Sequence, residues 1–178
     1  PRRQRFFKEM DIDFSIQLKE TEEKYPDSLR GVEITDYLSK LKADAFQNLA
    51  DNDLLITSDT IVWQDGKAIE KPNDTADAFR MLKLFSSSMH SVITSVTFTG
   101  KYFQKTINDT TKVWFNELTD EEINYYIKTC QPFDKAGSYG IQEWLGHVGV
   151  CKIEGSFFNV MGLPTHLVYK TLLNIAKK

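Results

Sequence analysis

The spacing of apolar residues predicts most of the helices of this chain. Between residues 33 and 50, apolar side chains recur every three or four positions and form one helix face, at Ile34, Leu38, Leu41, Ala45 and Leu49. A second helix follows the turn at 72–74, a third begins at the capping box of Thr119 and Glu122, and a last one begins at Pro164. A short amphipathic helix over residues 2–10 precedes them.

Alternating or continuous apolar runs predict the strands between these helices. The run from Asp11 to Leu18 alternates polar and apolar residues, which is typical of a half-buried strand. Residues 54–72 form a hairpin that turns at Asp65-Gly66, residues 91–100 and 105–115 form an antiparallel pair, and residues 150–164 form a second hairpin. Because strands interleave with helices and several pairs are hairpins, the fold class is α/β or α+β with a mixed sheet.

Composition and charge restrict the class of protein. The 178 residues, 41% apolar and 26% charged, suffice for one globular domain with a core. A net charge of −3 argues against nucleic acid as a partner, since nucleic-acid binders usually carry a strongly basic surface. No apolar run approaches the roughly 20 residues that span a bilayer, and the basic start lacks the apolar stretch of a signal peptide. With Cys130 and Cys151 interpreted as buried free thiols, a cytoplasmic enzyme or binding domain is favoured.

A carboxylate interrupts an otherwise apolar strand. Asp59 stands between Ser58 and Thr60, inside the run 54–63. A buried carboxylate must be hydrogen-bonded, paired with a cation or bound to a metal, and such a group suits a general base or a Mg²⁺ ligand. If this strand has a wet face, Asp59 only points into water. The residues alone leave the two interpretations even.

Basic side chains at predicted element ends suit an anionic ligand. Arg2 and Arg3 begin the first helix, where guanidinium groups and free backbone N–H groups together can bind phosphate. Lys42, Lys71 and Lys135 stand elsewhere along the chain, and Lys71 precedes a proline that restricts its backbone. Taken one at a time, each of these side chains is better interpreted as a solvated surface residue.

The segment DKAGSYGIQ, residues 134–142, is rich in glycine and shows neither the helical nor the strand periodicity of apolar residues. Its glycines let the backbone approach a ligand closely, and Gln142 can offer a paired donor and acceptor to the edge of a base. The segment matches neither GxGxxG nor GxxxxGK[ST], so dinucleotide and P-loop chemistry are not indicated. A tight structural loop is the alternative interpretation.

Five segments in the same order resemble motifs of the Maf family of nucleoside triphosphate pyrophosphatases. PRRQ is similar to the end of the family's SxSPRR opening, and SDTIVWQDGKAIEKP is similar to its (A/S)DTxVxxDGxxxxKP segment. MLKLFSSSMHSVITSV, DKAGSYGIQ and IEGSFFNVMGLP resemble MLxxLSGxxHxVxTxV, DKAGAYGIQ and IxGxYxxVxGLP. The resemblance covers almost the whole chain.

The resemblance implies hydrolysis of a nucleoside triphosphate between the α- and β-phosphates, with Mg²⁺ or Mn²⁺ as cofactor. Asp59 matches the catalytic base, and Asp59 and Glu23 are the implied metal ligands. The intact DKAGxYGIQ form resembles members that act on dTTP and UTP, and modified pyrimidine triphosphates such as 5-methyl-UTP and pseudo-UTP would suit the same loop. Implied substrate-binding positions are Arg2, Arg3, Glu23, Lys42, Thr60, Lys71, Asp134, Lys135 and Gln142.

The resemblance also implies a Maf/ITPase-like fold, with an elongated mixed sheet, flanking helices and a two-lobed active-site cleft in one domain over residues 1–178. The family's opening holds a hydrophobic strand and two serines before Pro-Arg-Arg, which are expected to be absent from a sequence that begins at Pro1. The main hypothesis is a cytoplasmic house-cleaning hydrolase without membrane or nucleic-acid partners, with a homodimer left open by analogy. The alternative is a nucleotide-binding regulator of cell division and septum formation that hydrolyses little or nothing.

Overall fold

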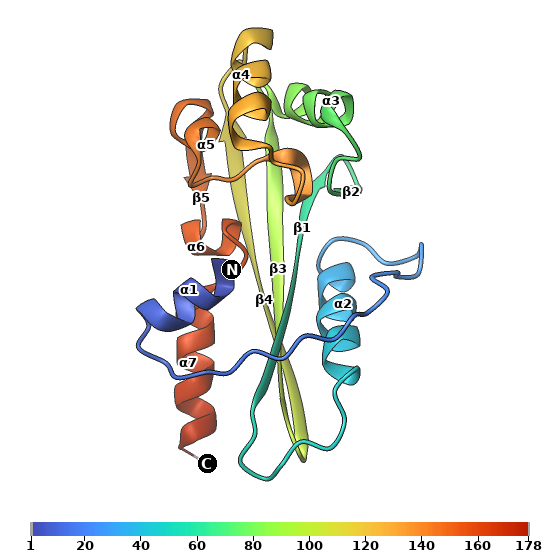
Figure 1. Cartoon of the computed structure of the whole chain (residues 1–178), viewed down its shortest axis with the longest axis vertical. Helices are drawn as coiled ribbons and strands as arrows, with labels where there is room; N and C mark the ends of the chain where they lie inside the picture. Colours follow the sequence, from blue (N-terminus) through green and yellow to red (C-terminus); the bar gives the residue numbers. More distant parts are fainter. Residues whose placement is uncertain (1, 178) are drawn as a thin grey trace.

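Three long strands form the axis of the molecule. The computed structural model describes residues 2–177, in which β1 (Leu55–Gln64), β3 (Met89–Gly100) and β4 (Phe103–Phe115) run side by side along most of its length (Figure 1). The short strands β2 (Lys67–Ile69) and β5 (Val150–Glu154) complete a sheet in the order β2-β1-β3-β4-β5. Every strand pairing within the described residues is antiparallel. The α/β class and the elongated sheet are therefore confirmed.

Helices gather around both ends of this sheet. One end is surrounded by α3 (Thr75–Phe85), α4 (Asp120–Cys130), η1 (Ala136–Ser138) and α5 (Trp144–Gly149) (Figure 1). Along the other half, α2 (Val32–Asp44) flanks the strands on one side in this view, and α1 (Arg2–Glu9) and α7 (Thr165–Ala176) flank them on the other. The short α6 (Phe157–Val160) lies between the two groups.

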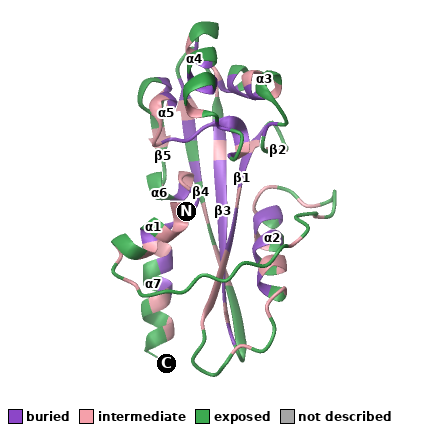
Figure 2. Cartoon of the chain, viewed as in Figure 1, coloured by how far each residue is buried: buried purple, intermediate pink, exposed green. Residues whose placement is uncertain are grey.

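The long strands bury different side chains on their two faces. In β3, Val96 and Phe98 belong to a core with α1 and α7, whereas Ile93 belongs to a core with Ile34 and Leu38 of α2. A third core joins the upper ends of the strands to α3, α4 and α5. Burial accordingly concentrates in the strands and in the helix faces turned toward them, while the stretch between α1 and α2 is mostly exposed (Figure 2).

The segment 11–18 is not a strand, and this prediction was wrong. Phe14, Ile16 and Leu18 are exposed, Leu18 to 91%. A period-two pattern yields a strand only where a neighbouring strand supplies backbone hydrogen bonds. Instead, the segment crosses in front of the long strands toward α2, where Lys19 Nζ donates to the carbonyl of Ala45 at 2.6 Å (Figure 1).

Two further differences concern the sheet. The sequence predicts a mixed sheet, but α3 returns the chain to the side of β1 at the same end of the sheet, so β3 runs antiparallel to β1. The predicted hairpin over 150–164 is wrong in its second half, because the chain leaves β5 through Gly155 (φ 126°) and enters α6. The hydroxyl of Ser156 caps that helix by accepting the N–H of Asn159.

Other sequence predictions are confirmed. The β1–β2 hairpin turns at Asp65-Gly66, the helix after the turn at 72–74 is present as α3, and the capping box of Thr119 and Glu122 starts α4. Both cysteines are free, as predicted, but neither is buried, since Cys130 is half-buried and Cys151 is exposed. Within residues 2–177, no helix has the length and apolar character that crossing a membrane requires.

A neutral histidine in the core gives stability a pH dependence. His90 lies among the rings of Phe85, Phe115 and Tyr139, and its Nε2 is 2.7 Å from the Tyr139 hydroxyl oxygen. Burial lowers the pKa of His90 from 6.5 to about 3. Between these two values the unfolded chain binds the proton and the folded chain does not, so folding stability falls as pH falls through this window.

We expect the free energy of unfolding to drop by about 2 kcal/mol from this residue alone between about pH 7 and about pH 5. Urea titrations at both pH values measure it, with His90→Gln as the variant that lacks the contribution. Replacing the exposed His166 by Gln should leave the pH dependence as in the parent chain. Equal pH dependence in the parent and the His90→Gln variant would contradict the prediction.

Candidate active site

Asp59 is a buried acid paired with a lysine. It lies in the middle of β1 with 6% of its surface exposed. Lys42 Nζ, from α2, lies 2.7 Å from Asp59 Oδ1 and 2.8 Å from Glu23 Oε1. The interpretation in which Asp59 points into water is therefore excluded, and three of the predicted site residues meet at one ammonium group.

The charges around Glu23 favour its ionised form. Burial raises the pKa of Glu23, but the hydrogen bond and charge of Lys42, together with the charges of Lys71 and Arg3, outweigh burial and hold the pKa below its usual value. Lys71 is itself exposed at the end of the β1–β2 hairpin. Its charge acts on Glu23, and its place in an anion site stays a prediction.

Arg3 fastens the start of the chain to β1. Its Nε donates to the carbonyl of Gly162 at 2.9 Å, Nη1 to the carbonyl of Ser58 at 3.1 Å and Nη2 to Thr60 Oγ1 at 3.2 Å. Burial lowers the pKa of Arg3, and the nearby charge of Asp59 opposes that effect. Because each nitrogen of the guanidinium already has a protein acceptor, Arg3 holds α1, β1 and the turn before α7 together.

Thr60 links Arg3 to the neighbouring strand β3. Its Oγ1 is 3.0 Å from Thr94 Oγ1 on β3, and Thr94 Oγ1 donates to the carbonyl of Asn159 in α6. Alternate residues of a strand point to opposite faces, so Thr60 faces Arg3 and α6 while Asp59 faces α2. The two predicted site residues thus lie on opposite faces of β1.

A second group of predicted residues surrounds Lys135. Lys135 is only 8% exposed, and its Nζ lies 2.7 Å from Asp134 Oδ1 and 3.0 Å from Glu143 Oε1. Burial raises the pKa of Asp134, but the hydrogen bond and charge of Lys135 and the charge of Arg2 outweigh it and lower that pKa. Arg2 also acts on Arg3, so its charge reaches both groups of residues.

The glycine-rich segment lies against the β1–β2 hairpin. The N–H of Gly137 donates to the carbonyl of Glu70 at 3.0 Å, immediately before Lys71. Gly137 has φ 69°, and a Cβ there would meet Phe85 and Val62 at 3.0–3.1 Å, so both its conformation and its packing require glycine. Gln142 is half-buried and makes no hydrogen bond with the other predicted positions among the described residues.

Two residues beside Lys135 carry no signal in the sequence motifs. Glu143 binds Lys135, and Tyr126 of α4 donates its hydroxyl hydrogen to Glu143. Tyr126 is fully buried on the apolar face of α4 with Ile123 and Ile127, so periodicity identifies it only as a core residue. The usable signal was chemical, because a buried tyrosine hydroxyl normally has a hydrogen-bond partner.

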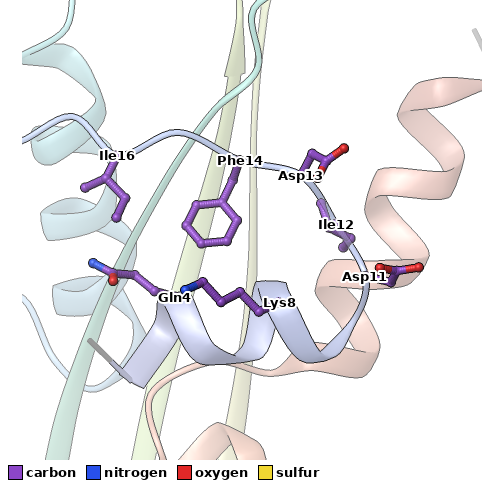
Figure 3. Close-up of a pocket in the computed structure, with 7 residues that line it drawn as sticks. All are labelled: Gln4, Lys8, Asp11, Ile12, Asp13, Phe14 and Ile16. Carbon is purple, nitrogen blue, oxygen red and sulfur yellow. The ribbon is translucent and has the colours of Figure 1, made fainter.

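A hollow of about 450 Å³ lies between α1 and the segment 11–16, and none of the predicted site residues lines it. Figure 3 shows the side chain of Lys8 extending from α1 below the ring of Phe14, and that of Gln4 extending toward the side of Ile16. The residues that line this hollow are Gln4, Lys8, Asp11, Ile12, Asp13, Phe14 and Ile16. With one lysine and two aspartates, this hollow offers little positive charge to an anionic ligand.

The chain is similar to one protein family and to several named enzymes. The family model described as Maf-like protein matches residues 1–175. The chain is 56% identical to a dTTP/UTP pyrophosphatase of Flavobacterium psychrophilum, over 98% of this chain and 90% of that protein. It is 53% identical to the dTTP/UTP pyrophosphatase of Flavobacterium johnsoniae, over 98% and 91% of the two chains. Identity to the dTTP/UTP pyrophosphatase of Bacteroides thetaiotaomicron is 44%, over 97% and 90%.

Proposed function

Because this chain belongs to the Maf family, we propose that it is a nucleoside triphosphate pyrophosphatase acting on dTTP and UTP. Relatives up to 56% identical along nearly the whole chain carry that name. The observation that carries the proposal is the meeting of Asp59, Lys42 and Glu23 at one ammonium group, with Arg3 on the adjoining edge of β1. Four segments far apart in sequence contribute to it, which is typical of a site built by the fold.

In the proposed reaction, a water molecule attacks the α-phosphorus of the nucleoside triphosphate. A water oxygen bonds to that phosphorus, the bridging bond to the β-phosphate breaks, and Asp59 takes the proton that the water loses. The products are a nucleoside monophosphate and pyrophosphate. Such transfers depend mainly on placement and on stabilising the charge that develops on the phosphate oxygens. Arg2, Lys42, Lys71 and Lys135 supply the positive charge, and Gln142 contacts the base. Thr60, which lies on the other face of β1, holds the guanidinium of Arg3 beside this strand.

The donor set fits a hard divalent cation, Mg²⁺ or Mn²⁺. Among residues 2–177 there is no group of three or more histidine, cysteine, aspartate or glutamate side chains that could hold a metal. Two carboxylates do converge, however, because Asp59 and Glu23 both reach Lys42 Nζ. Mg²⁺ commonly binds through one or two carboxylates plus substrate phosphates, so Asp59 and Glu23 would hold it together with the triphosphate. Bound there, it would neutralise phosphate charge and polarise a phosphate oxygen.

The proposal places the enzyme in the cytoplasm. Its two cysteines are free, and free thiols are usual in a reducing compartment.

Pyrophosphate release tests the proposal directly. The chain is incubated with dTTP, UTP, 5-methyl-UTP, pseudo-UTP, dCTP, ATP and GTP, with Mg²⁺ or Mn²⁺ and in parallel with EDTA. We expect release of pyrophosphate, not orthophosphate, from the uridine and thymidine nucleotides, and its loss with EDTA.

Two other outcomes would contradict the proposal. Thermal stabilisation by dTTP without any release of pyrophosphate would favour the nucleotide-binding regulator. Release of orthophosphate would show attack at the γ-phosphorus and would refute the assigned bond cleavage.

A further inference from the structure

The carboxylate of Glu143 receives two donors at once. Its Oε1 is 3.0 Å from Lys135 Nζ, and its Oε2 accepts the hydroxyl hydrogen of Tyr126. The same Tyr126 oxygen accepts the N–H of Gly140 at 2.9 Å. Tyr126 therefore connects a rigid helix to both ends of the segment 140–143, and Glu143 connects that helix to Lys135.

Burial and close packing restrict the hydrogen bond between Tyr126 and Glu143. Tyr126 is fully buried, so its hydroxyl group cannot exchange Glu143 for water, whereas the side chain of Glu143 is 23% exposed. A Cβ added at Gly140 would lie 2.7 Å from Glu143 Cδ, so the absence of a side chain at Gly140 permits the carboxylate to occupy this place. Ile141 and Gln142 lie between Gly140 and Glu143, and the N–H of Glu143 donates to the carbonyl of Gly140 at 3.0 Å, which restricts the backbone of Gln142.

We infer that Tyr126 and Glu143 are positioning residues, which hold Lys135 and the Gly140–Gln142 segment in place for the triphosphate. The inference rests on the proposed function, since it assumes that Lys135 and Gln142 contact substrate. It adds two residues that touch no substrate themselves and that act through Lys135 and through the backbone of the segment. Nothing in the sequence motifs singled them out.

Only a group with two acceptor oxygens satisfies this arrangement. A glutamine at 143 has one acceptor, so its amide nitrogen would face either the Lys135 ammonium or the Tyr126 hydroxyl hydrogen. One of the two donors then loses this acceptor; Lys135 keeps Asp134 but loses the negative charge of Glu143, so its ammonium group shifts. Because a phosphate-binding lysine acts on bound substrate and transition state alike, its displacement raises KM more than it lowers kcat.

The experiment measures steady-state hydrolysis of dTTP by Glu143→Gln and Tyr126→Phe. We expect KM to rise about tenfold in each, as outer contacts of a site typically give, with kcat within about threefold of the parent. The matched controls are Tyr125→Phe, the exposed neighbour on α4, and Glu117→Gln, an exposed glutamate. Both controls should keep the parental KM.

A double-mutant cycle separates positioning from a general loss of structure. If Glu143 acts through Lys135, Glu143→Gln should raise KM by less than about twofold in a Lys135→Ala background. An unchanged or lower KM in Glu143→Gln overturns the inference, and so does the same increase with and without Lys135.

Failure of the proposed function would be visible separately. Calorimetry with a non-hydrolysable α,β-imido analogue of dTTP gives dissociation constants for the same variants. A parent chain that binds the analogue but releases no pyrophosphate refutes hydrolysis, and the ratio of dissociation constants then decides the inference. A parent chain that neither binds nor hydrolyses overturns both.

Discussion

Asp59→Asn should abolish pyrophosphate release while leaving the fold intact. The change keeps the size of the side chain and its place in β1, but it removes the group proposed to take the proton from water. A general base contributes about 10²–10⁴-fold to rate, and loss of a metal ligand adds to this, so we expect kcat to fall by at least about 10³-fold. Lys42 keeps Glu23 as a partner, so the melting temperature should change by only a few degrees.

The measurement combines a pyrophosphate assay with circular dichroism and thermal unfolding. Asp65→Asn is the matched control, because Asp65 is exposed in the β1–β2 turn at φ 50°, a conformation that asparagine also tolerates. That variant should retain full activity. Turnover by Asp59→Asn within about tenfold of the parent would remove Asp59 from the role of base.

The sequence predicted elements well where the signal is local. The Asp65-Gly66 turn and the capping box at Thr119 depend on a few adjacent residues, and the structure contains both. The segment 11–18 shows the opposite case. Its alternation is as regular as that of a strand, but pairing requires a neighbouring strand, and that neighbour is not a property of the segment itself.

The candidate site depends on long-range contacts in the same way. Periodicity could not decide whether Asp59 is buried, because its burial depends on contact with α2. Lys42, the residue of α2 that contacts Asp59, is 17 positions away in the sequence. The motif resemblance supplied that missing information, and it named residues from both groups of the site. Glu143 and Tyr126 were missed because one follows directly after the motif and the other lies in an ordinary apolar helix face.

Hydroxyl groups on α2 set the place of Lys42. Thr35 Oγ1 lies 2.7 Å from Ser95 Oγ, and Ser39 Oγ lies 2.8 Å from Thr97 Oγ1, so the helix contacts β3 through paired hydroxyls. Positions 35, 39 and 42 follow the spacing of four and three that defines one helix face. The contacts that fix the register of α2 on the sheet therefore also direct Lys42 toward Asp59.

Lys42→Met should reduce both stability and activity. It removes the ammonium group that lies between Asp59 and Glu23 and leaves the buried Asp59 carboxylate without its charged partner. An unsatisfied buried group costs about 1–3 kcal/mol, so we expect the free energy of unfolding to fall by that amount. Because Lys42 is proposed to stabilise phosphate charge in the transition state, kcat/KM should fall by about 10²–10³-fold.

The double variant Lys42→Met with Asp59→Asn separates the two effects. Neutralising Asp59 removes the unpaired charge, so urea titration should show most of the lost stability restored relative to Lys42→Met alone. Pyrophosphate release should be absent, as in Asp59→Asn, because the proposed base is missing as well. If the second substitution destabilises the chain further, the loss in Lys42→Met does not arise from an unpaired Asp59, and the electrostatic account of this site is wrong.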